Sequence, residues 1–202
     1  MGCGIITGGG PGLMQAANEG AALAGGGHNV GIRVHLPFEQ EVNAFVAEAY
    51  ELQTFFSRLH HFVLASDAFV VVPGGIGTVL ELAMIWQLLQ VRKLNQTPLI
   101  LVGRVWAEFV EWGRRYLLRA DIPLANSEDF DIPHCVDGAS DAIALIRECY
   151  QQWLTKVATP SVLSEHSCLR AAARLGHTKM APNRGSIVCV LRIELLSQLK
   201  VL

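Results

Sequence analysis

Short β-branched runs alternate with helical patterns along most of the chain, and this predicts an α/β fold: a doubly wound parallel sheet with helices on both faces. Two glycine-rich loops support this class, because each follows a predicted strand and opens a predicted helix, as βα turns do in such sheets. The 202 residues are enough for one such domain with a sizeable core, or for a domain with an appendage. We therefore expect a Rossmann-like domain.

The expected elements follow one another in strict alternation. Pro11 stands where the first turn of a helix tolerates proline, and Gly25-Gly26-Gly27 is a natural helix stop. The β-branched runs predict strands at Cys3–Thr7, Asn29–Val34, Ala68–Val72, Pro98–Val102 and His134–Val136. The patterns between them predict helices at Pro11–Ala24, Phe55–Ala65, Gly77–Val91, Val105–Arg119 and Gly138–Leu154.

The distribution of charge divides the chain into two parts. The whole chain has a formal charge of −2, which does not favour nucleic acid or an anionic membrane as a partner. Residues 1–154 carry 9 basic and 16 acidic side chains, whereas residues 155–202 carry 7 and 2. We interpret 1–154 as the domain and 155–202 as a basic tail of uncertain order. Within the tail, Ile187–Leu191 could form a strand, a short buried helix or neither.

Several classes of protein are disfavoured by the sequence. It has no apolar run near the roughly 18 residues of a membrane span, and its first residues do not resemble a secretory signal. The five cysteines form no CxxC pair, which suits reduced thiols. His60 and His61 are adjacent, so on a helix they point about 100° apart and cannot form an i, i+4 metal pair. We expect a cytoplasmic protein with no membrane partner, metal or cofactor.

The two glycine loops, Thr7–Met14 and Pro73–Glu81, are the candidate binding elements. Glycines let successive N–H groups converge at a helix N-terminus and bind an anion such as phosphate, although a tight turn for helix packing is the alternative. The dinucleotide pattern GxGxxG fails in both loops, because Leu13 and Leu80 occupy the third glycine position. The chain also lacks Gly-Lys-Ser/Thr, so a Walker loop is excluded.

Four segments resemble one known family. Pro73–Glu81 matches PGGxGTxxE and Thr7–Met14 matches TGGGxxGxM. The segment from Phe55-Phe56-Ser57-Arg58 to Ser66-Asp67-Ala68-Phe69 resembles RK…SDAF, and Leu36-Pro37-Phe38-Glu39-Gln40 with Asn43 resembles a branch that carries LPFEQ. The sequence is thus similar, over about residues 3–153, to the LOG family of cytokinin riboside 5′-monophosphate phosphoribohydrolases, long labelled lysine decarboxylases. That family begins with a further strand and helix, so the domain is expected to lack its first strand-helix unit. Leu59 stands where the family usually has lysine.

The resemblance implies a reaction and a set of site residues. The reaction is hydrolysis of the N-glycosidic bond of a nucleoside 5′-monophosphate, a step of cytokinin biosynthesis, by a homodimer. Glu81 would stabilise the ribosyl cation and activate water, and Arg58 would orient the substrate or assist the leaving base. The remaining expected contacts are phosphate binding by Gly74, Gly75, Gly77 and Thr78, and lining of the other side of the nucleotide by Gly9, Gly10 and Gly12.

Other interpretations remain open. Arg58 and Glu81 could form an ordinary ion pair between helices, and Asp67 is expected to cap or close a turn. A decarboxylase with pyridoxal phosphate would need a Schiff-base lysine, but Lys93, Lys156, Lys179 and Lys200 lie outside every motif. A nucleotide-binding or carrier protein without catalysis could have the same fold.

Overall fold

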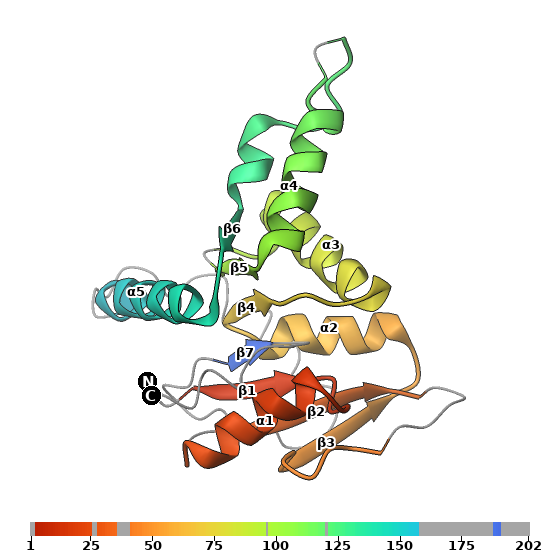
Figure 1. The fold of residues 1–202 in the computed structure, drawn as a ribbon, viewed down its shortest axis with the longest axis vertical. Coiled ribbons are helices and arrows are strands. Elements are labelled where there is room, and N and C mark those ends of the chain that lie inside the picture. The colour runs from red at the N-terminus through yellow and green to blue at the C-terminus, as the bar shows by residue number, and fades with distance from the viewer. Residues whose placement is uncertain are drawn as a thin grey trace.

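A computed structural model describes residues 3–25, 28–35, 41–95, 97–119, 121–157 and 188–190. These residues form a parallel sheet in the order β3-β2-β1-β7-β4-β5-β6 (Figure 1). The strands are β1 (Gly4–Thr7), β2 (Asn29–Val34), β3 (Glu48–Leu52), β4 (Ala68–Val71), β5 (Leu99–Val102), β6 (Pro133–Val136) and β7 (Val188–Val190). The helices are α1 (Leu13–Leu23), α2 (Phe55–Ala65), α3 (Ile76–Gln90), α4 (Arg104–Leu117) and α5 (Ala139–Val157), with a 3₁₀ turn, η1, at Ser127–Asp131.

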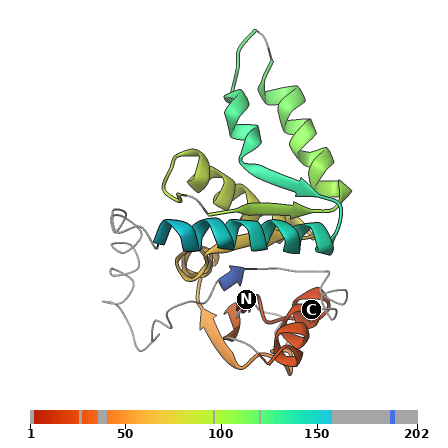
Figure 2. The same cartoon turned by 90° about the vertical axis from the view of Figure 1, so that its left-hand side faces the viewer.

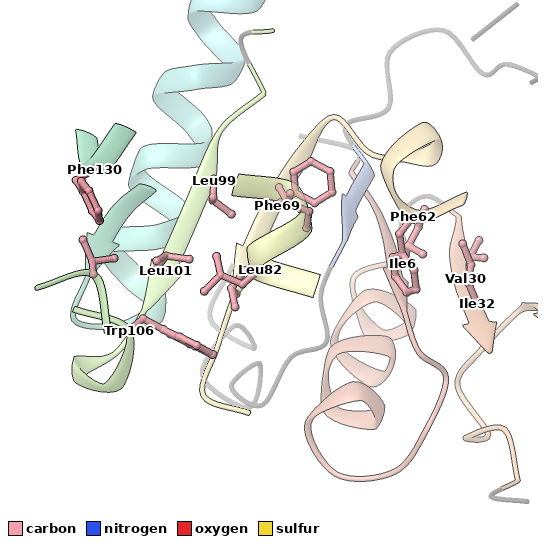
Figure 3. Packing of buried hydrophobic residues seen from close by; sticks show 13 residues of the cluster. Ile6, Val30, Ile32, Phe62, Phe69, Leu82, Leu99, Leu101, Trp106 and Phe130 are labelled. Atoms are coloured by element: carbon pink, nitrogen blue, oxygen red, sulfur yellow. The ribbon is translucent and has the colours of Figure 1, made fainter. Parts of the chain in front are cut away.

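Helices cover both faces of the sheet, so the predicted doubly wound α/β class is confirmed. On β4, Phe69 and Val71 pack into the cluster that contains Leu82 of α3 and Trp106 of α4, which Figure 3 shows. The alternate residues of β4 belong to a second cluster with Ala17 of α1 and with α5, the helix at the front of Figure 2. The period-two alternation of a strand thus sends its side chains into two separate cores.

The described elements agree with the predicted ranges to within one or two residues, except that α5 extends to Val157. Helix α2 begins as predicted because Thr54 caps it, accepting a hydrogen bond from the Ser57 N–H at 3.1 Å. Pro11 lies just outside α1, whose N-cap is Gly12, and Gly25 follows the helix with a φ of +61°.

Two described elements were missing from the prediction. The strand β3 is mostly exposed and reads Glu-Ala-Tyr-Glu-Leu, so it has neither a continuous apolar run nor a strong β-branched signal. The turn η1 is held by a reciprocal cap between Asn126 and Asp129. Such a cap can indicate the start of a helix, but the segment is too short for its sequence to predict one.

A short strand from the tail lies in the middle of the sheet. Val188–Val190 forms β7, which pairs in parallel with β1 on one side and with β4 on the other. Of the three alternatives for Ile187–Leu191, the structure therefore supports a strand. The sheet is not made by residues 1–154 alone, and the expected boundary at Leu154 stays a prediction. Residues 36–40, with the LPFEQ resemblance, and the rest of the tail beyond Val157 lie outside the described residues.

Candidate active site

Both glycine loops lie at the same edge of the sheet. The first follows Thr7 at the end of β1 and the second follows Val71 at the end of β4. The strands are parallel, so both carboxyl ends face the edge where doubly wound folds bind ligands. One strand, β7, separates β1 from β4, so the two loops begin about 10 Å apart at the strand spacing of parallel sheets. The two loops therefore lie near each other at this edge.

The second loop presents an uncapped helix N-terminus. Gly75 is the N-cap of α3, no side chain caps it, and the first turn contains no acidic residue. Gly74 and Gly75 are exposed, whereas Thr78 is buried with its side chain packed beneath Gly74. The exposed N–H groups and the helix dipole favour an anion here. The structure thus brings Gly74, Gly75, Gly77 and Thr78 together in one turn.

The first loop is more buried. Gly9 and Gly12 have φ values of +73° and +70°, which other residues rarely adopt. Gly9 and Gly10 are buried and Gly12 is exposed, so the three predicted residues do not share one accessible surface. Gly9 packs on Gly31 of β2, where an added Cβ would lie 3.4 Å from the Gly31 Cα. Glycine at position 9 therefore also allows the loop to pack closely against β2.

Arg58 and Glu81 form a buried ion pair beside these loops. The Arg58 Nη1 donates to the Glu81 Oε1 at 2.7 Å, with side chains 5% and 13% exposed. The Arg58 Nε donates to the Ile32 carbonyl within β2, and its guanidinium lies over the Phe62 ring. A Cβ on Gly8 would come within 3.0 Å of the Arg58 Nη2. One side chain therefore touches the first loop, β2 and the helix of the second loop.

The ion pair between helices that the sequence left open as an alternative is present. The fixed, planar guanidinium holds the Glu81 carboxylate in one position through a charge-assisted hydrogen bond. A carboxylate held near an anion-binding turn can act on the sugar of a bound nucleotide. A carboxylate held in this way can stabilise a developing positive charge or accept a proton.

A buried polar cluster, not predicted from the sequence, lies at the first loop. Asn18 of α1 and Asn29 of β2 are buried and bonded to each other and, through further bonds, to Thr7 and Asn43. Asn43 was singled out only because it follows the segment that resembles LPFEQ, and neither Asn18 nor Asn29 was singled out. The available signal was polar residues at core positions of predicted apolar elements.

A small cavity adjoins the candidate site, and other described residues offer weaker candidates. A cavity of about 20 Å³ lies between α2, β4 and α3, lined in part by Phe62, Thr78 and Glu81, and it has room for about one water molecule. His60 and His61 are exposed. In the described part of the chain, no group of three His, Cys, Asp or Glu side chains is arranged to hold a metal ion. None of the described helices is long and apolar enough to cross a membrane.

Comparison with known proteins identifies the class of this domain. The family model described as "possible lysine decarboxylase" matches residues 14–146, which include the second glycine loop, Arg58 and Glu81. The chain therefore belongs to this family, the LOG family that its motifs resemble. A search of curated proteins gives no match.

Proposed function

We propose that this protein hydrolyses the N-glycosidic bond of a nucleoside 5′-monophosphate, giving the free base and ribose 5-phosphate. The observation that supports this most is the buried Arg58–Glu81 pair, which lies between two glycine loops at one edge of the sheet. Membership of the LOG family adds weight, because the family typically consists of phosphoribohydrolases.

In the proposed reaction, the bond between C1′ of ribose and the base nitrogen breaks, and a cation-like centre develops at C1′. The Glu81 carboxylate stabilises this charge and accepts a proton as the water oxygen bonds to C1′. The leaving base takes up a proton from solvent as it departs, and Glu81 afterwards releases the proton it accepted to solvent. The N–H groups of Gly74, Gly75 and Gly77, with Thr78, hold the 5′-phosphate at the start of α3. Binding of the phosphate fixes the ribose above Glu81 and so lowers the entropic cost of reaction.

Arg58 is proposed to act chiefly through Glu81. Its Nε and Nη1 already donate to Ile32 and Glu81, and Nη2 lies beside Gly8. This geometry orients the carboxylate and ties it to the first loop. We also propose that Arg58 assists the departure of the base.

The name of the family suggests a decarboxylase, but the described lysines do not favour one. Lys93 is exposed and follows the C-terminal end of α3. A helix of 15 residues is about 22 Å long, so Lys93 lies far from the glycine loop at the other end. The backbone of Lys156 belongs to α5, on the opposite face of the sheet from α3.

A homodimer is also proposed. Phe56 and Ile76 are each 84% exposed, and Leu80 is 48% exposed, near the N-termini of α2 and α3. A dimer interface over these side chains would remove their apolar surface from water. Size-exclusion chromatography with light scattering should give twice the mass of the chain, and a monomer at micromolar concentration would contradict the proposal.

Release of free base from a panel of nucleoside 5′-monophosphates tests the proposed function. The matching nucleosides are the control, because they lack only the group that α3 is proposed to bind. We expect base and ribose 5-phosphate in equal amounts from at least one monophosphate and much slower release from its nucleoside. Tight binding of a monophosphate without base release would instead indicate the nucleotide-binding or carrier alternative. Equal affinity for nucleoside and monophosphate would contradict the phosphate site.

A further inference from the structure

The buried polar cluster of Thr7, Asn18, Asn29 and Asn43 joins four separate segments. Thr7 ends β1, Asn18 lies in α1, Asn29 begins β2, and Asn43 precedes β3. Their exposed fractions are 0%, 0%, 6% and 9%. Buried polar groups cost free energy unless each finds a partner, so a cluster of four requires a specific set of hydrogen bonds.

Each amide in the cluster has one orientation that satisfies its neighbours. The Asn18 Oδ1 accepts from the Thr7 hydroxyl at 2.8 Å and from the Asn43 Nδ2 at 3.0 Å. The Asn18 Nδ2 donates to the Asn29 Oδ1, and the Asn29 Nδ2 donates to the Asn18 and Phe45 carbonyls, both at 2.7 Å. The donors and acceptors match in every bond, which fixes the relative positions of α1, β2 and the segment of Asn43.

The cluster also fixes the backbone of the first glycine loop. The Thr7 hydroxyl accepts from the Gly9 N–H at 2.9 Å. Asn43 donates from its backbone N–H to the Gly9 carbonyl at 2.9 Å and from Nδ2 to the Gly10 carbonyl at 3.0 Å. These bonds hold both carbonyls on the buried side of the loop, and they do not engage the N–H groups of Gly8 or Gly10. Both carbonyls are therefore already bonded to Asn43 within the protein.

We propose that Thr7 and Asn43 are positioning residues that hold the first glycine loop in the conformation that binds the nucleotide; this inference rests on the proposed function. Flexible glycines would otherwise lose much conformational entropy when the ligand binds. The cluster fixes them during folding instead. The effect falls on the part of the nucleotide that the first loop lines, because the bonds of Thr7 and Asn43 go to Gly9 and Gly10 and not to the phosphate site of the second loop.

The chain offers a matched control inside the same cluster. Asn29 is buried and bonded like Asn43, but its side-chain bonds go to Asn18 and Phe45 and none goes to the loop. Asn29→Ala and Asn43→Ala should both lower the melting temperature, whereas only Asn43→Ala should loosen the loop directly. Thr7→Val removes the hydroxyl that accepts a hydrogen bond from the Gly9 N–H, and Thr7→Ser keeps it.

Calorimetric titration of the full chain with adenosine 5′-monophosphate and with inorganic phosphate, below the melting temperature of every variant, tests this role. We expect Asn43→Ala and Thr7→Val to lower the affinity for the nucleotide about ten-fold, because the loss of one hydrogen bond has about this effect. Asn29→Ala and Thr7→Ser should bind it like the parent, and phosphate affinity should stay unchanged in all four.

Two other results have distinct meanings. If Asn29→Ala weakens the nucleotide as much as Asn43→Ala does, the cluster is merely structural and the positioning role is wrong, although the proposed function stands. If the parent binds neither adenosine 5′-monophosphate nor any other member of the panel, the proposed function and this inference are both overturned.

Discussion

Adding one methyl group at Gly74 should disturb the second glycine loop far more than adding it at the neighbouring Gly75. A Cβ on Gly74 would lie 2.3 Å from the Thr78 Oγ1, 2.9 Å from its Cβ and 3.2 Å from its Cγ2. Thr78 is buried and β-branched, so its side chain has few rotamers available in a helix and cannot move aside. At Gly75 an added Cβ meets nothing within 4 Å, and the φ of −84° suits alanine.

The two variants should therefore differ in stability. Overpacking typically costs about 1–3 kcal/mol, which lowers the melting temperature of a chain of this size by about 2–12 °C. Gly75→Ala should lose less than about 1 kcal/mol, through the weaker N-cap preference of alanine. Thermal unfolding followed by circular dichroism measures both. Equal melting temperatures for the two variants would refute the packing of Thr78 beneath Gly74.

Two further predictions concern the core and the tail. Gly113→Ala should destabilise the protein by about 1–3 kcal/mol, because its Cβ would lie 2.7 Å from the Phe130 ring; a melting temperature within 1 °C of the parent's would contradict this packing. Cys189→Pro should destabilise it more than Cys189→Ala, because only proline removes an N–H from a strand paired on both sides, and a partner carbonyl left unbonded costs about 1–3 kcal/mol. Equal denaturation midpoints for those two variants would show that β7 does not support the sheet.

The sequence was sufficient to predict the fold class and most of its elements, because their signals are local. Thr54 caps α2 with residues of its own first turn, and the buried strands β4 and β5 are continuous apolar runs. The exposed strand β3 has no such signal, and it exists because β2 offers it a partner. The three residues of β7 gave no means of choosing among strand, helix and coil; their position is decided by pairing with β1 and β4.

The part of the candidate site that lies in recognisable motifs could be predicted from the sequence. Arg58, Glu81 and the second loop were expected from motifs, and the structure brings them together. The burial of Gly9 and Gly10, and their attachment to Thr7 and Asn43, depend on contacts between residues up to 34 positions apart. Such contacts leave no periodic pattern in the sequence, so the hydrogen bonds of the polar cluster are visible only in three dimensions, although polar residues at core positions are a signal of it.

The central claim is that the Glu81 carboxylate promotes cleavage of the glycosidic bond, and Glu81→Gln tests it most directly. The amide oxygen of glutamine can still accept from the Arg58 Nη1, so the fold and nucleotide affinity should change little. Removal of the charge and of the proton acceptor should slow base release by about 10²–10⁴-fold. The measurement is the rate of base release at saturating nucleoside 5′-monophosphate, beside the dissociation constant from calorimetry. Hydrolysis by Glu81→Gln at the parental rate, with unchanged affinity, would show that Glu81 is structural and that the proposed mechanism is wrong.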